Sequence, residues 1–228
     1  MLRFRTQSTV SKPVVSSSCP IVAVGGADIE PSDLNIFPTQ TPLYVAADGG
    51  ANHLLAAGLR PAAVIGDLDS LSSTARAAFG AILHYVVEQD TTDFEKLLTR
   101  VDAPLIVALG FLGGRLDHSF AVFNVLARFP SRRVLLVGQE DFCFLARQGT
   151  SRIALPDGCR VALIPLGPAR VSTEGLRWDL SDAPLSLTDQ ISTSNMANGP
   201  VSFDIKGPVL RGVGREGLAA GLDAVRGQ

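Results

Sequence analysis

Two carboxylates stand one residue apart, directly after a short apolar run. Asp67 and Asp69 follow residues 62–65, which read Ala-Ala-Val-Ile. If this run is a strand of an open α/β sheet, both acids lie at its carboxyl end, where such sheets bind ligands. Paired carboxylates hold hard cations such as Mg²⁺, so the spacing favours a metal-dependent enzyme. The alternative is that the two acids only cap the following helix.

Glycines or acids also follow four other apolar runs. They are Gly25 and Gly26, then Asp48, Gly49 and Gly50, then Asp90 and Asp93, and finally Gly113, Gly114 and Asp117. A parallel sheet brings such strand ends to one rim, where glycines let backbone N–H groups approach phosphates. Acids there would repel a phosphate unless a metal intervened. We therefore predict a nucleotide polyphosphate bridged to the protein by Mg²⁺, with Arg115 neutralising the developing charge.

Each of these groups has a simpler interpretation. Thr92 and Glu95 have the spacing of a capping box, and Lys96 can form a surface ion pair with Asp93 one turn earlier. Residues 115–118 can be a helix-start cluster in which Asp117 is the cap. The common nucleotide fingerprints, G-x-x-x-x-G-K-[ST] and an early G-x-G-x-x-G, are absent from the sequence.

The order of the predicted elements indicates two parts. Short β-branched runs predict strands at 21–24, 43–47, 62–65, 82–87, 105–109 and 134–137. Helical patterns lie between them at 51–57, 92–101 and 117–129. This alternation predicts an α/β fold with a doubly wound, mostly parallel sheet. Only strands and turns are expected after residue 139, which predicts an all-β sandwich. The expected division is an N-terminal extension (1–18), an α/β nucleotide-binding domain (19–146) and a β-sandwich domain (147–228).

Composition narrows the class of protein. The 228 residues are 46% hydrophobic and carry a net charge of -2, so the chain is globular and has no basic excess for nucleic acid. No apolar run reaches the roughly 20 residues of a membrane span. The cysteines at 19, 143 and 159 form no C-x-x-C pair, which favours free buried thiols in the cytoplasm. Residues 1–20 contain cations and no acid, as transit peptides do, but an ordinary extension that donates a strand near 13–15 is favoured.

Six motifs in order resemble those of the thiamine pyrophosphokinase family. They lie at 47–52, 66–70, 89–96, 113–118, 173–180 and 191–195. The resemblance implies an α/β nucleotide domain with a C-terminal β-sandwich. It also implies a homodimer with shared active sites, which transfers a pyrophosphoryl group from ATP to the thiamine hydroxyl and uses Mg²⁺. The position before Gln89 is Glu88 where the family usually has Asp, and the chain after Asn195 matches poorly.

The resemblance also implies roles for individual residues. Asp67, Asp69 and Asp93 would hold Mg²⁺ as part of the catalytic set, which Arg115 completes. The residues implied in binding the nucleotide or thiamine are Asp48, Gly49, Gly50, Asn52, Gln89, Thr92, Lys96, Asp117, His118, Ser192, Ser194 and Asn195. Of these, Gln89 would contact the thiamine pyrimidine. Ser192, Ser194 and Asn195 would close the thiamine site from the partner subunit.

Two other functions fit the same motifs. A D-x-D sequence after a strand also occurs in metal-dependent nucleotidyltransferases and glycosyltransferases. A non-catalytic thiamine-binding module on the same scaffold is the second alternative. His118 is expected to be a structural hydrogen-bonding residue if it has no role in binding, and Trp178, the sole tryptophan, can be sandwich core.

Overall fold

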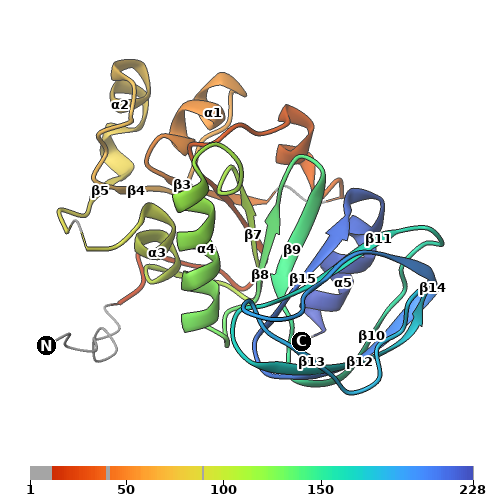
Figure 1. Cartoon of the computed structure of the whole chain (residues 1–228). Helices are drawn as coiled ribbons and strands as arrows, with labels where there is room; N and C mark the ends of the chain where they lie inside the picture. The colour runs from red at the N-terminus through yellow and green to blue at the C-terminus, as the bar shows by residue number, and fades with distance from the viewer. Residues whose placement is uncertain (1–11, 40–41, 89, 228) are drawn as a thin grey trace, which may run out of the picture.

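The N-terminal half of the chain is a parallel sheet (Figure 1). The computed structural model describes residues 12–39, 42–88 and 90–227. The sheet order is β8-β7-β2-β3-β4-β5, and all five pairings are parallel. Its strands are β2 (Ile21–Val24), β3 (Leu43–Ala47), β4 (Ala63–Gly66), β5 (Leu83–Tyr85), β7 (Ile106–Leu109) and β8 (Val134–Val137). Most are aliphatic runs buried throughout, as expected for strands that helices cover on both faces.

Helices cover the two faces of this sheet. On one face lie α1 (Gly50–Ala56), α2 (Ser73–Phe79) and α5 (Leu218–Arg226), and on the other α3 (Asp93–Leu98) and α4 (Leu116–Arg128). Short 3₁₀ turns are η1 (Pro31–Asn35), η2 (Gly80–Ile82) and η3 (Arg215–Gly217). Alternate residues of β2 serve the two cores, since Val22 packs on the side of α1 and Ala23 on the side of α3. The doubly wound arrangement predicted from the sequence is therefore present.

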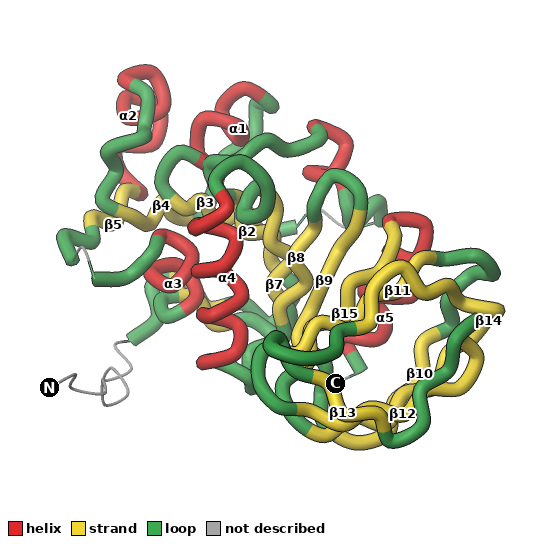
Figure 2. Tube along the Cα trace, viewed as in Figure 1, coloured by secondary structure: helices red, strands yellow, loops and turns green. Residues whose placement is uncertain are grey.

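The C-terminal half is antiparallel (Figure 2). Its strands are β9 (Asp141–Leu145), β10 (Gly149–Ile153), β11 (Arg160–Pro165), β12 (Ala169–Leu176), β13 (Ala183–Leu185), β14 (Ser192–Lys206) and β15 (Val209–Gly214). β14 pairs with β11 near its start and with β10 and β12 further along, so one long strand serves both layers. Val201, Phe203 and Ile205 alternate along β14 and point into the core between the layers.

The two halves share one hydrogen-bonded sheet. β9 pairs antiparallel with β8, where Cys143 stands opposite Leu136, and β15 then continues the sheet from β9. Within the described residues this sheet has thirteen strands, of which β10 pairs only with β14 and lies off the main order. The parallel and antiparallel parts are therefore joined by main-chain hydrogen bonds as well as by side-chain packing.

Some elements differ from those predicted. Helix α5 near the C-terminus was not expected, although Leu222 and Val225 stand three residues apart and are both buried. The strand expected from the N-terminal extension near 13–15 is present but begins only at Val15: β1 (Val15–Ser16) pairs in parallel with β6 (Val101–Asp102). Residues 1–11 lie outside the described part. No helix in the described ranges is long and apolar enough to cross a membrane.

Candidate functional site

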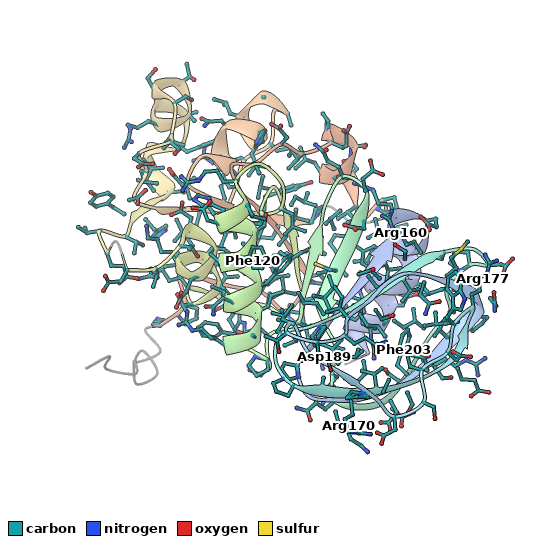
Figure 3. All side chains as sticks on the ribbon, in the orientation of Figure 1. Phe120, Arg160, Arg170, Arg177, Asp189 and Phe203 are labelled. Carbon is teal, nitrogen blue, oxygen red and sulfur yellow. The ribbon has the colours of Figure 1, made fainter. Side chains whose placement is uncertain are left out.

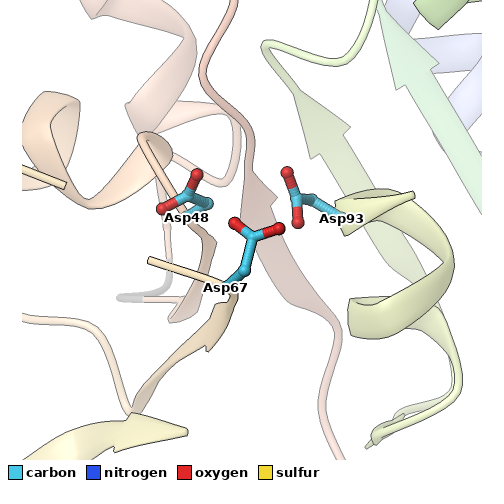
Figure 4. A group of neighbouring side chains, drawn as sticks. All are labelled: Asp48, Asp67 and Asp93. Carbon is cyan, nitrogen blue, oxygen red and sulfur yellow. The ribbon is translucent and has the colours of Figure 1, made fainter. Parts of the chain in front are cut away.

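Three carboxylates from separate segments converge at the rim of the parallel sheet (Figure 4). Asp48 follows β3, Asp67 follows β4 and Asp93 begins α3. One oxygen of each carboxylate lies within 4.8 Å of an oxygen of the other two. Strands β3 and β4 are parallel neighbours, which places their carboxyl ends side by side. We call these three residues the carboxylate cluster. Its oxygen atoms are the ligands that Mg²⁺ and Ca²⁺ prefer.

Asp48 is the most buried member of the cluster, with 3% of its surface exposed. Its Oδ2 accepts a hydrogen bond from the Ser70 N–H at 3.2 Å, whereas Oδ1 has no partner within the described residues. Burial, followed by the charge of Asp93, raises the pKa of Asp48 to about 6. A buried oxygen without a donor is costly unless a proton or cation meets it. The cluster therefore fits a divalent cation.

Lys96 lies inside the site rather than at the surface. It is 2% exposed, and its Nζ is 3.0 Å from Asp67 Oδ2 and 3.3 Å from Asp93 Oδ1. Burial opposes its charge, but the hydrogen bond to Asp67 and the charge of Asp93 raise the pKa of Lys96 above its usual value. Burial also disfavours the charged form of Asp93, which for an acid raises the pKa, and Lys96 opposes that shift. The predicted i,i+3 pair exists, but its lysine is buried whereas the Asp93 side chain is 39% exposed.

Asp69 stands at the edge of the cluster. It is exposed, and its Oδ1 accepts a hydrogen bond from Ser70 Oγ at 2.9 Å. Its carboxyl adds a small upward shift to the pKa of Asp48 and of Asp93, which places it nearby. β4 ends at Gly66, and Leu68 has a left-handed backbone with φ 62°. In an extended strand, residues two apart such as Asp67 and Asp69 would point to the same side. The turn at Leu68 ends that alternation, so the two side chains do not point the same way.

Glycines at the rim allow close backbone packing. A Cβ atom on Gly50 would lie 1.9 Å from the carbonyl oxygen of Val24, so the start of α1 can approach the end of β2 only without a side chain. Gly110 after β7 has φ 71°, and an added Cβ would lie 2.7 Å from the Gly25 oxygen. A Cβ on Gly49 would be 3.3 Å from that of Ser70. Backbone packing thus accounts for Gly50 and Gly110.

Two other predicted binding residues have structural partners. Asn52 donates to the Ser70 carbonyl and accepts from the Ser72 N–H, both at 3.0 Å, and so ties α1 to the loop after β4. Thr92 caps α3 by accepting from the Glu95 N–H at 3.3 Å. The reciprocal half of the predicted capping box is missing, because the Glu95 carboxylate binds Arg128 instead.

The group at the start of α4 is exposed. The Arg115 side chain is 71% exposed, and its guanidinium donates to both carboxylate oxygens of Asp117, at 3.1 and 2.5 Å. Arg115 itself occupies the N-cap position, so the interpretation of Asp117 as the cap is wrong. His118 is also exposed in the first turn of α4. This group forms a polar surface at the helix start.

The predicted thiamine residues lie on the antiparallel half. Asn195 is 4% exposed, and its amide binds the main chain of Trp178, accepting from N at 3.2 Å and donating to O at 2.7 Å. Trp178 is 55% exposed and lies under the Arg177 guanidinium at 4.9 Å, so it is not sandwich core. Ser194 is exposed with φ 58°, and Ser192 is half-buried. Gln89 lies outside the described residues.

Within one chain, these residues and the carboxylate cluster lie on opposite sides of the molecule. Figure 3 labels Arg177 at the far edge of the antiparallel half, whereas β4 and α3 lie across the molecule. The sequence motifs are therefore brought together in two groups, one per half. Arg128 on α4 binds Glu95 on α3 and was not predicted from the sequence. The two residues are 33 positions apart, and no motif links them.

Comparison with known proteins agrees with this arrangement. The sequence model of the thiamin pyrophosphokinase catalytic domain matches residues 36–137, and that of the family's vitamin B1 binding domain matches residues 151–210. The chain belongs to the thiamin pyrophosphokinase family. Thiamine pyrophosphokinase 1 of Oryza sativa subsp. japonica is 33% identical over 188 residues, which cover 68% of this chain and 71% of the relative. Thiamine pyrophosphokinase of Bacillus subtilis is 25% identical over 77% of this chain and 87% of its own.

Solved structures of the family share the fold. The thiamin pyrophosphokinase from Candida albicans superposes with a TM-score of 0.77 at 18% identity, covering 90% of this chain and 94% of that one. The protein from Geobacillus thermodenitrificans superposes with a TM-score of 0.74 at 27% identity, covering 86% and 96%. The mixed α/β sheet is therefore the fold of the thiamin pyrophosphokinase family.

Proposed function

We propose that this protein transfers the pyrophosphoryl group of ATP to the hydroxyl of thiamine, giving thiamine diphosphate and AMP. The observation that carries the proposal is the carboxylate cluster at the rim of a sheet whose sequence matches the catalytic model of the thiamin pyrophosphokinase family. The second family model, for vitamin B1 binding, supplies the acceptor substrate. A nucleotidyltransferase or glycosyltransferase would leave this second match without a role.

In this proposal the carboxylate cluster would hold Mg²⁺, and Asp69 at its edge would be a further ligand for the metal of the Mg–ATP complex. The metal supplies charge neutralisation and alignment of the ATP phosphates. Asp48 offers its free Oδ1, and the Ser70 N–H fixes the other oxygen. Arg115, exposed at the start of α4, can leave Asp117 for a phosphate that arrives from solvent. The main task of these residues is alignment.

We also propose a homodimer in which each thiamine site is shared. Within one chain, β14, which carries Asn195, lies across the molecule from β4 and α3 in Figure 1, and this separation supports the arrangement. Residues 19–146 would form the catalytic part and residues 147–228 the thiamine-binding part, in keeping with the ranges of the two family models. Asn195 would act by holding the loop of Trp178 in place. The three free cysteines favour the cytoplasm as the location.

The direct test is product analysis with purified protein. AMP and thiamine diphosphate should form in equal amounts from ATP, thiamine and Mg²⁺, and AMP should not form without thiamine. UDP or inorganic diphosphate as the product would instead indicate a glycosyltransferase or nucleotidyltransferase. Thiamine binding without turnover would identify a non-catalytic binding module.

A subunit-mixing experiment tests the shared site. The Asp67→Asn variant should be nearly inactive alone, and Asn195→Ala should keep about a tenth of wild-type activity at thiamine concentrations well below KM. The two variants are mixed at equal ratio, allowed to exchange subunits and assayed at such a thiamine concentration. Random assortment should give about half mixed dimers, each with one intact site, so activity should approach roughly a quarter of wild type. Native mass spectrometry verifies the exchange. A mixture that exchanges fully but gains no activity contradicts the shared site.

A further inference from the structure

The ammonium group of Lys96 already neutralises part of the negative charge that would attract a metal ion to the carboxylate cluster. It lies within hydrogen-bonding distance of Asp67 and Asp93, whereas Asp48 Oδ1 has no partner within the described residues. We infer that Lys96 is a built-in counter-cation, which weakens Mg²⁺ binding by the nucleotide-free protein and so makes firm metal binding depend on the nucleotide. This inference rests on the proposed function and assigns Lys96 as a positioning residue.

The charge balance supports this role. When all members are ionised, three carboxylates and one ammonium leave two net negative charges in the site. Lys96 thus lowers the negative charge that attracts Mg²⁺ from three units to two. Without Lys96, three negative charges would stand within 4.8 Å of one another, and mutual repulsion would favour capture of any divalent cation.

Lys96 cannot easily move out of the site. Its main chain is fixed within α3, where its N–H donates to the Thr92 carbonyl at 2.8 Å. Its own carbonyl accepts from Arg100 Nη1 at 3.1 Å and from Thr99 Oγ1 at 3.2 Å. The side chain is 2% exposed, so no open surface is available to the ammonium. Its charge therefore stays close to any cation that enters.

A nucleotide changes this balance because its phosphates add negative charge and further oxygen ligands. The phosphate oxygens would give the metal ligands that are not already paired with Lys96. The ammonium would also lie near the incoming phosphates. The same lysine that weakens binding of the free metal would thus favour the metal–nucleotide complex. Lys96 would be kept in place by Asp67 and Asp93 in both states.

The test measures Mg²⁺ binding to the nucleotide-free protein by calorimetry and by the Mg²⁺-dependent shift in Tm. Lys96→Met removes the charge and keeps the length, Lys96→Arg keeps the charge, and Lys206→Met is the matched control at an exposed lysine on β14. Lys96→Met should bind Mg²⁺ roughly tenfold tighter than wild type or more, since an adjacent charge shifts ionic equilibria by about one to three logarithmic units. Lys206→Met should match wild type. Unchanged or weaker binding by Lys96→Met would overturn the inference.

A second variant allows for a folding defect. Lys96→Gln removes the charge but keeps a donor for Asp67, so it should fold more readily and also bind Mg²⁺ more tightly. If either variant folds only when Mg²⁺ is present, the metal has replaced the missing charge, which supports the inference. If both variants stay unfolded at saturating Mg²⁺, the cation cannot replace the lysine, and the inference fails.

These measurements separate the inference from the proposed function, because they use neither ATP nor thiamine. Tighter Mg²⁺ binding by Lys96→Met together with no AMP formation by wild type would retain the counter-cation and reject the kinase. AMP formation by wild type together with unchanged Mg²⁺ binding by Lys96→Met would retain the kinase and reject the counter-cation. In the active enzyme, Lys96→Arg should retain a larger share of kcat than Lys96→Met.

Discussion

Arg128 on α4 binds the carboxylate of Glu95 on α3 through two hydrogen bonds, of 2.8 and 2.6 Å. Glu95 is 6% exposed, so its charge depends on this partner. Two-pronged guanidinium–carboxylate pairs fix orientation as well as distance. Because α3 also carries Asp93 and Lys96, this pair sets the position of one side of the site.

Replacing Arg128 by methionine should therefore affect both stability and activity. It leaves the Glu95 carboxylate buried without a partner, and the unfolding free energy should fall by about 2 kcal/mol, less than for a fully buried pair because Arg128 is 43% exposed. Urea unfolding measures the loss, and the rate of AMP formation should fall with it. Arg170→Met, which removes an exposed pair with Asp182, serves as the control and should change neither quantity.

The carboxylates should separate into two classes on substitution by asparagine. Asp48→Asn removes a buried member of the cluster, so the nucleotide-free protein should bind Mg²⁺ about tenfold more weakly, and turnover should fall by orders of magnitude. Asp69→Asn should leave Mg²⁺ binding without nucleotide unchanged, because Asp69 is exposed at the edge, yet still reduce turnover with Mg-ATP. Calorimetry and steady-state kinetics on the same preparations measure both. Near-normal kcat for Asp69→Asn at saturating Mg²⁺ would remove Asp69 from the metal set.

Asn195→Ala should act on thiamine rather than on ATP. The amide of Asn195 holds the backbone of Trp178, and its loss leaves partly buried main-chain groups without this partner, at a cost of about 1–3 kcal/mol. We expect the KM for thiamine to rise about tenfold while the KM for ATP stays within twofold, if roughly half of that energy acts on the site. Trp178 is the sole tryptophan, so fluorescence anisotropy reports its mobility directly. Unchanged anisotropy with intact thiamine kinetics would contradict this role.

Arg211 provides a test inside the antiparallel half, where it packs against Phe203, which Figure 3 labels. Arg211 is 1% exposed, its guanidinium lies 4.3 Å from the ring centre of Phe203, and its Nη2 donates to Ser151 Oγ at 2.6 Å. Nε has no partner in the described chain, and burial lowers the pKa of Arg211 to about 10. Arg211→Met should therefore be neutral or stabilise by about 1 kcal/mol, since a buried charge is replaced by an apolar side chain. Arg211→Ala should destabilise, because it leaves a cavity. Urea unfolding distinguishes the two.

The cysteines should differ in reactivity. Cys19 is exposed, which corrects the expectation that all three thiols are buried, whereas Cys143 and Cys159 are buried. Burial raises the pKa of both buried thiols to about 12, so neither ionises near pH 8. A thiol reagent at pH 8 should label one group in the folded protein and three after denaturation. Because unfolded thiols ionise near 9.0, folded stability should fall as the pH rises above that value.

The parallel half could be predicted from local sequence. The runs that became β2 and β3 have the predicted bounds, because short β-branched segments between turn residues report their own conformation. The place of Asp67 at a strand end followed from the same pattern. The family motifs added thiamine as the acceptor. Helix α5 and the full length of β14 escaped prediction, since their signals are weak without knowledge of what they pack against.

The sequence by itself determined which acids lie at strand ends and therefore that a carboxylate site was to be expected. Only the tertiary structure decided that Asp48 joins Asp67 and Asp93 while Asp69 lies at the edge. That outcome depends on β3 and β4 being neighbours and on the left-handed turn at Leu68, neither of which the spacing specifies. The burial of Lys96 was likewise decided in space, because a lysine one turn after Asp93 stays solvated unless another strand end covers it.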